Sequence, residues 1–268
     1  MIEATAKARF GRWGIAPILQ IGSILALVLG WQLAGRAMPK LEMFFPSIEK
    51  ILAAGWRMLV AGQFNEHLIV SGQELALGFG LGAGLGILVG IFLGSNRYFG
   101  GVLEPFVNYV AVVPKIIIYP VFILFLGIGI WSKVAMGASS AFFPIAINTI
   151  VGIQMVNPMF VKVARTLGAG TFQIYRTVYL PAIAGPIIAG IRVGMGVAVI
   201  GTLIAETKVA KAGLGRMVID QYSELRMPEM YASLILIFAG AMALNLIMGM
   251  VYAHVTRYRR GSGESSTL

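Results

Sequence analysis

The chain has 268 residues, of which 58% are hydrophobic and only 12% are charged. Soluble globular domains are roughly 45–50% apolar and about 25% charged, so a soluble fold could not bury this much apolar surface. This composition excludes a soluble enzyme, a nucleic-acid-binding domain and a disordered chain, and it predicts a polytopic membrane protein. The net charge of +10 fits this class, because cytoplasmic loops of membrane proteins collect Lys and Arg.

Six apolar stretches approach the length of about 20 residues that a helix needs to cross a bilayer. The first exceeds the apolar region of a signal peptide and has no clear cleavage site, so we expect it to stay as a span. The sequence therefore predicts an all-α polytopic membrane protein with about six transmembrane helices. The stretches are residues 17–35, 68–93, 102–128, 131–153, 183–204 and 231–254.

The basic ends of the chain orient these spans. Six spans place both termini on one side, and the positive-inside rule makes that side cytoplasmic. We therefore expect a cytoplasmic segment at residues 1–16, a single transmembrane domain at residues 17–256, and a disordered cytoplasmic tail at residues 257–268. The basic residues at the two ends are Lys7, Arg9, Arg12, Arg257, Arg259 and Arg260.

Two segments face the outside in this orientation, residues 36–67 and residues 205–229. The first contains apolar residues at helical spacing, directly after Pro46 and Ser47. This pattern predicts a short helix on the membrane surface. Its apolar residues are Ile48, Ile51, Leu52, Trp56 and Leu59.

The predicted second span carries glycines four residues apart. Residues at this spacing share one helix face, so that face is bare backbone and lets a neighbouring helix approach closely. Gly80 and Gly84 add a second row. The glycine face can serve packing within the subunit, or it can be a sliding or subunit-contact surface. Its members are Gly78, Gly82, Gly86, Gly90 and Gly94.

The predicted third span contains Pro105, Pro114 and Pro120, which should kink or break its helix. Broken helices occur at membrane depth where they are buried or line a cavity. Lys115 follows near mid-span, and a cation inside a bilayer is a functional hypothesis by default. Lys115 can therefore line a translocation pathway; alternatively, it snorkels or pairs with Glu74 of the second span.

Enzyme signatures are absent from the sequence. His67 and His254 are the only histidines, so we predict no zinc motif, no metal ligands and no catalytic residues. No Gly-Lys dipeptide occurs, so the chain lacks a phosphate-binding loop and we expect it to bind no cofactor itself. If ATP drives transport here, another subunit must bind it.

The cytoplasmic segment of residues 154–181 has the pattern of two helices joined by a glycine turn. The first helix begins at Asn157, which can cap it, and the turn lies at residues 168–170. Thr171 can cap a second short helix, which Pro181 should end. Such a projection favours a docking surface for a partner; the alternative is a loop that packs on itself.

Residues 163–181, VARTLGAGTFQIYRTVYLP, resemble the EAA loop of ABC importer membrane subunits. Ala164 matches the second Ala of that pattern, Gly168 matches its Gly, and residues 180–181 match its Leu-Pro ending. Lys162 stands where the pattern has Glu, and the Val that follows it replaces the first Ala.

Further stretches are similar to the nitrate/sulfonate/taurine branch of these permeases. They are PKIIIYPVFIL at residues 114–124, FPIAIN at residues 143–148, AET at residues 205–207 and GLG at residues 213–215. The resemblance covers roughly residues 65–255. Related branches import bicarbonate, aromatic acids, pyrimidine vitamin precursors or riboflavin, so these solutes are alternatives.

The resemblance implies the permease subunit of an ATP-driven importer in the bacterial cytoplasmic (inner) membrane. Its solute would be a small anion such as a sulfonate, taurine or nitrate. Two membrane subunits, expected as a homodimer, would form the pathway, and two ATPase subunits would bind ATP and Mg. An extracytoplasmic solute-binding protein would deliver the solute. A stand-alone secondary transporter is the alternative, but no internal repeat supports it.

The resemblance also assigns roles to residues. The coupling loop would dock on the ATPase through Lys162, Ala164, Arg165, Gly168, Ala169, Gly170 and Phe172. Candidates for the translocation pathway are Lys115, Glu74, Asn148 and Glu206. Asn148 could instead join two helices. Glu206, at the outer end of the fifth span, would line the outer mouth or touch the binding protein.

Overall fold

The computed structural model describes residue 17, residues 19–33 and residues 43–260. The predicted N-terminal segment, residues 1–16, and residues 261–268 of the predicted tail lie outside the described residues. The described part of the chain is built of helices and turns and contains no strand. The predicted all-α class is confirmed.

Four helices are long and apolar enough to cross a bilayer. They are α3 (Gln63–Ser95), α6 (Ile130–Gln154), α9 (Leu180–Lys208) and α11 (Met227–Arg260). These helices correspond to the second, fourth, fifth and sixth predicted spans. A shorter apolar helix, Leu19–Leu33, occupies the first predicted span.

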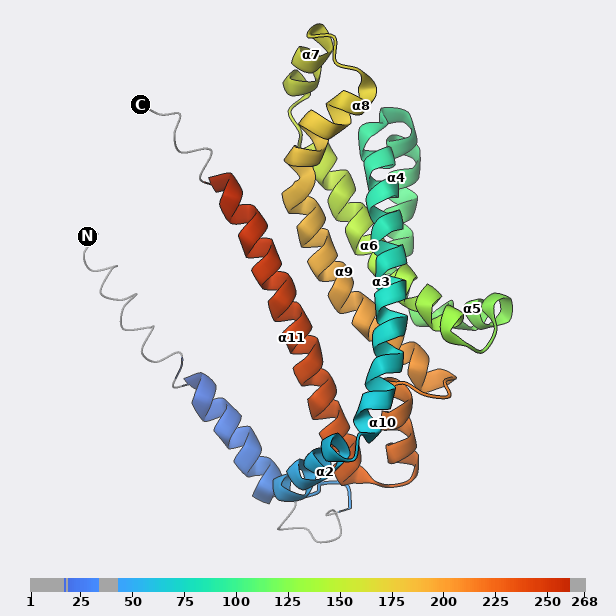
Figure 1. Cartoon of the computed structure of the whole chain (residues 1–268), viewed down its shortest axis with the longest axis vertical. Helices are drawn as coiled ribbons and strands as arrows, with labels where there is room; N and C mark the ends of the chain where they lie inside the picture. The colour runs from blue at the N-terminus through green and yellow to red at the C-terminus, as the bar shows by residue number, and fades with distance from the viewer. Residues whose placement is uncertain (1–16, 18, 34–42, 261–268) are drawn as a thin grey trace, which may run out of the picture.

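The third predicted span is not one helix. α4 (Arg97–Val112) ends before Pro114, a short 3-10 turn, η2 (Lys115–Ile117), follows, and α5 (Tyr119–Leu126) then leaves the bundle sideways (Figure 1). The residue before Pro114 has extended backbone, because a following proline disfavours the helical conformation. The break expected at the prolines is therefore present, but the continuous span over residues 102–128 is wrong.

The predicted orientation agrees with the arrangement of the helices. α2 (Ile48–Val60) and α10 (Leu214–Ser223) lie at one end of the bundle, and α7 (Pro158–Thr166) lies at the other (Figure 1). Helix Leu19–Leu33 begins, and α11 ends, toward the α7 end (Figure 1). The two predicted outer segments therefore share one side, and the predicted coupling loop lies on the opposite side.

The predicted surface helix forms as α2, but part of its apolar stripe points outward. Ile51, Ala54 and Met58 are buried against α10 and α11, at helical spacing. Leu52 and Trp56 are exposed, with Trp56 at 71%. α2 thus has one apolar side inside the protein and a second apolar side available to the membrane surface.

α6 is the central helix, packed between α3 and α9. The α3 side of this contact is the predicted glycine face. A Cβ added at Gly78 would lie 2.8 Å from the Val134 carbonyl oxygen, and one at Gly86 would lie 2.9 Å from that of Phe142. The face therefore serves packing within the subunit. All five of its glycines meet α6 in this way: Gly78, Gly82, Gly86, Gly90 and Gly94.

α9 also packs on α6 through glycines, on the side of α6 opposite α3. The sequence analysis missed this second glycine contact. A Cβ added at Gly190 would lie 2.9 Å from the Asn148 Cβ, and one at Gly194 would lie 2.8 Å from the Ile145 side chain. Small residues on both neighbours let three helices meet at backbone distance, which is how packing holds helices together in lipid.

We predict that Gly82→Ala destabilises the protein by roughly 1–3 kcal/mol, because the new methyl group would overlap the Ala138 backbone in α6. Gly84→Ala is the matched control, since no atom lies within 4 Å of a Cβ added there. Thermal unfolding of the purified protein in detergent measures both variants. An equal loss of stability in the two would contradict the assignment of the packing face.

Candidate functional site

The first half of the predicted coupling loop forms as expected. The Asn157 side chain accepts a hydrogen bond from the Met159 backbone N–H (2.9 Å) and caps α7. Gly168 follows with a φ of +80°, in the left-handed region that favours glycine. The predicted glycine turn therefore depends on this one backbone conformation.

The second predicted helix does not end at Pro181. α8 (Thr171–Ile174) passes through a π-helical turn, η3 (Tyr175–Tyr179), directly into α9. Proline lacks the N–H of a regular helical bond, and the wider π turn just before it accommodates that loss. Thr171 is the first helical residue, so the capping position falls on Gly170 and the predicted Thr171 cap is wrong.

The coupling loop exposes large apolar side chains. No residue of α7 is buried, Leu167 is 81% exposed and Phe172 is 79% exposed. A loop packed on itself would hide such groups, so the exposed surface favours a partner. The exposed Phe160 was missed by the sequence analysis; the available signal was the number of large apolar residues in a water-facing segment.

Two exposed cations accompany these apolar groups. Lys162 and Arg165 lie on α7 and form no ion pair within the described part of the chain. Ala164 of α7 and Ala169 of the glycine turn are half-buried. The surface is therefore both apolar and basic.

The coupling loop is tied to the transmembrane core at its base. The Tyr175 hydroxyl lies 2.6 Å from the Ser95 hydroxyl at the end of α3, and Ser95 donates in turn to the Ile91 carbonyl (2.6 Å). Through α9, the same loop continues into the core without interruption. A displacement of the loop would therefore act on both α3 and α9.

Lys115 lies at the break between α4 and α5. Its ammonium donates to the backbone carbonyls of Val110 (3.2 Å) and Ala111, and it lies 4.6 Å from the centre of the Phe143 ring. The carbonyls at the end of α4 lack helical partners and carry partial negative charge, which explains this position. The alternative pairing of Lys115 with Glu74 is wrong.

Lys115 also borders a cavity of about 460 Å³ between η2, α6 and α9. Its lining is mostly apolar, with Ser140 and the Lys115 side chain as polar groups. Asn148 lies further along α6, where it donates to the Pro144 carbonyl of its own helix (2.8 Å). The Asn148 amide therefore bonds within α6 and does not join two helices, although its Cβ lies against Gly190 of α9.

Glu74 pairs instead with Lys133, which the sequence analysis missed. The two side chains lie on α3 and α6 with Nζ and Oε1 2.7 Å apart, and they are 1% and 6% exposed. Lys133 is the third residue of the fourth predicted span, close to its outer boundary. The pair is enclosed by the helix core, so Glu74 does not face an open pathway.

Glu206 is also enclosed, at 0% exposure. Its carboxylate accepts hydrogen bonds from the Ser71 hydroxyl (2.6 Å) and from the Gly215 N–H (2.6 Å). The expectation that Glu206 lines the outer mouth or touches a binding protein is therefore wrong. The chain folds back over Glu206 after α9 and covers it.

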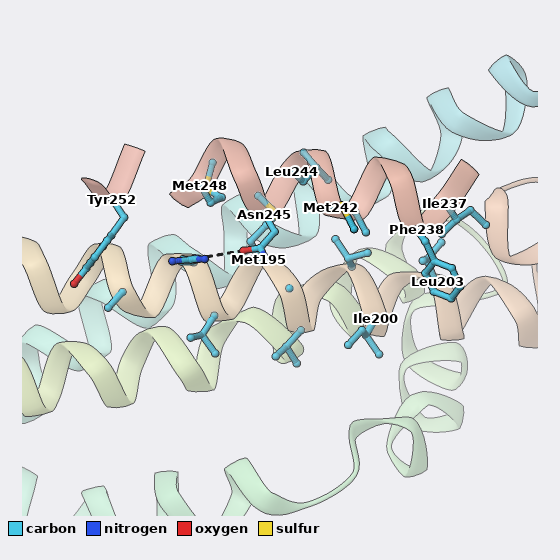
Figure 2. Close-up of a pocket in the computed structure, with 17 residues that line it drawn as sticks. Met195, Ile200, Leu203, Ile237, Phe238, Met242, Leu244, Asn245, Met248 and Tyr252 are labelled. Carbon is cyan, nitrogen blue, oxygen red and sulfur yellow. Dashed lines mark hydrogen bonds between the residues drawn. The ribbon is translucent and has the colours of Figure 1, made fainter. Parts of the chain in front are cut away.

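A groove of about 900 Å³ separates α9 from α11 (Figure 2). Its walls are mostly apolar, and the Arg192 Nε donates across it to the Asn245 Oδ1 (3.3 Å). This bond, dashed in Figure 2, joins the two helices part-way along the groove. α11 also packs on α9, and on α2 and α10 at its outer end.

Comparisons with known proteins agree with this arrangement. Residues 82–261 match the family model described as binding-protein-dependent transport system inner membrane component. The chain belongs to this family. It is thus the membrane permease subunit of an ABC importer of the sulfonate/taurine branch, and ATP hydrolysis is carried by a separate subunit.

Individual relatives cover most of the chain. The SsuC permease protein of Bacillus subtilis (strain 168), whose name refers to aliphatic sulfonates transport, is 33% identical over 77% of this chain and 75% of its own. The taurine transport system permease protein TauC of Escherichia coli (strain K12) is 28% identical over 77% and 78%. The permease is a multi-pass protein of the inner membrane, as the sequence predicted.

A solved structure shares the fold. The chain matches a structure titled as inward-facing conformations of the MetNI methionine ABC transporter, with a TM-score of 0.57. The match covers 74% of this chain and 96% of the other, at 20% sequence identity. Within the described residues, no group of three or more His, Asp or Glu side chains is placed to hold a metal ion.

We predict that Lys133→Met destabilises the permease by roughly 3–5 kcal/mol, because it leaves the Glu74 carboxylate buried without its counter-charge. The double variant Lys133→Met, Glu74→Gln should recover most of that loss, since it removes both charges. Thermal unfolding in detergent measures the three proteins. A double variant no more stable than Lys133→Met would show that the pair is not the source of the effect.

Proposed function

We propose that this permease pairs with a second copy of itself to form the pathway for a small organic anion, with an aliphatic sulfonate as the first candidate. Two ATPase subunits would bind ATP and Mg and dock on the two coupling loops. A solute-binding protein would deliver the anion from outside. The observation that carries this proposal is the exposed apolar and basic coupling loop at the inner end of the bundle.

The break in the third span supports a second membrane subunit. Backbone between α4 and α5 is irregular, and large apolar side chains flank it, with Tyr109 at 76% and Phe125 at 80% exposure. Irregular backbone at membrane depth needs protein or a water-filled cavity beside it, because lipid cannot satisfy its polar groups. A second copy placed against α4 and α5 would provide that cover.

The substrate class rests on two independent observations. The names of the SsuC and TauC relatives refer to aliphatic sulfonates and taurine, both of which carry a sulfonate. Lys115 supplies a cation at the edge of a cavity beside the break, with no carboxylate bonded to it among the described residues. A fixed positive charge at membrane depth would favour an anion over a cation.

Substitution of Gly168 tests whether the coupling loop couples an ATPase subunit to transport. Gly168→Val should abolish most ATP-dependent uptake in proteoliposomes, because a β-branched residue at a φ of +80° costs roughly 1–3 kcal/mol and distorts the turn. Gly168→Asn is the matched control, since Asn tolerates this conformation. The amount of ATPase that copurifies with the tagged Val variant distinguishes two causes of lost uptake. A low amount means lost docking, and a normal amount means lost coupling. Full uptake by the Val variant would contradict the coupling role.

Lys115 tests the anionic substrate. Lys115→Met should lower the uptake of an aliphatic sulfonate about tenfold, because it removes the fixed positive charge from the pathway. Lys115→Arg keeps the charge and should retain most of the uptake. Both variants are compared as assembled transporters at equal ATPase content. Equal uptake by the Met and Arg variants would assign Lys115 a structural role at the end of α4.

A further inference from the structure

The connection between α9 and α10 is held by side chains from two transmembrane helices. Successive backbone N–H groups at the start of α10 each donate to a different side chain of α3 or α9. Such a run of bonds fixes both the position and the direction of the segment. The bonds are Gly213 N to His67 Nδ1 (3.1 Å), Leu214 N to Ser71 Oγ (2.7 Å) and Gly215 N to Glu206 Oε2 (2.6 Å).

Ser71 links two of these bonds. Its hydroxyl accepts from the Leu214 N–H and donates to the Glu206 Oε1 (2.6 Å). Ser71 is 6% exposed and Glu206 is fully buried, so water does not compete for either group. Bonds to a buried carboxylate at a helix N-terminus are among the stronger ones in proteins.

The two glycines of the Gly213-Leu-Gly215 stretch allow this approach. Gly213 has a φ of +128°, and a Cβ added there would lie 2.5 Å from the Glu206 Cδ. A Cβ at Gly215 would lie 2.9 Å from the Glu206 Cβ. The backbone therefore closes around the carboxylate only because both positions lack side chains.

α10 also contacts the other outer elements. The Ser233 hydroxyl of α11 donates to the Gln221 Oε1 (2.8 Å), and Met217 packs with residues of α2. On its outer side α10 carries an ion pair between Arg216 and Asp220 (2.8 Å), partly open to solvent. α10 thus joins a polar outer surface to four helices of the permease.

We propose that Glu206, Ser71 and His67 form a clasp that positions α10 and transmits docking of the solute-binding protein to α3 and α9. The clasp residues are positioning residues, since their polar atoms bond to the start of α10 and Glu206 is fully buried. The same α9 continues without interruption into the coupling loop, so the clasp and the ATPase contact lie on one helix. The inference rests on the proposed function, because it requires a docked binding protein and ATPase.

The test uses the permease purified with its ATPase in lipid nanodiscs, and the binding protein recovered with it. Ser71→Ala removes one acceptor and one donor of the clasp without adding bulk, and Glu206→Gln removes the charge. Both should raise amide hydrogen exchange over residues 213–223 by about tenfold. Both should also lower the binding-protein-stimulated ATPase rate about tenfold and leave the basal rate unchanged.

Thr149→Val is the matched control, because it removes a buried hydroxyl that bonds only to the Ile145 carbonyl of its own helix. It should behave as the wild type in both measurements. If Glu206→Gln does not assemble, Ser71→Ala decides the result alone.

The outcomes separate the clasp from the proposed function. If the binding protein stimulates the variants as strongly as it stimulates the wild type, the clasp alone is overturned, whether or not amide exchange rises. Faster exchange together with lost stimulation in the variants supports it. A wild-type complex that recovers no ATPase, or does not respond to the binding protein, would overturn the proposed function and the coupling role with it.

Discussion

The close contact of α6 with α3 and α9 is the constraint on which the rest of the permease depends. Lipid gives helices no hydrophobic reason to associate, so contact area and backbone proximity must hold them together. Glycines on α3 and α9 supply that proximity, and at Gly78 and Gly190 no larger residue fits. Because three helices meet at backbone distance, they form a firm core to which less tightly packed elements such as α11 are attached.

The outer end of this core contains charges that the bilayer would otherwise exclude. Glu74 and Lys133 neutralise each other across the contact of α3 with α6, and Glu206 is satisfied by Ser71 and a backbone N–H. Burying charges is expensive unless each one is paired or hydrogen-bonded, so these groups specify which helix ends meet. The outer segment is thereby attached to the core by polar bonds, whereas the core itself is held by apolar packing.

The inner end of the bundle exposes apolar side chains, whereas the outer end buries polar ones. The coupling loop leaves apolar side chains such as Leu167 and Phe172 exposed to water. Their burial would contribute free energy only when a partner covers them. Continuity of α8, η3 and α9 connects this surface to the clasp at the other side of the membrane. One long helix therefore spans the two places where partners of the permease would act.

The sequence by itself determined the membrane class, four of the six predicted spans, the glycine face, the break at Pro114 and the place of the coupling loop, because each follows from local composition or helical spacing. Only the tertiary structure decided that Lys133 rather than Lys115 pairs with Glu74, and that Glu206 is enclosed. Those outcomes depend on how helices are rotated and how deep each side chain lies. Both are set by contacts between residues far apart in the chain, which spacing along one helix does not encode.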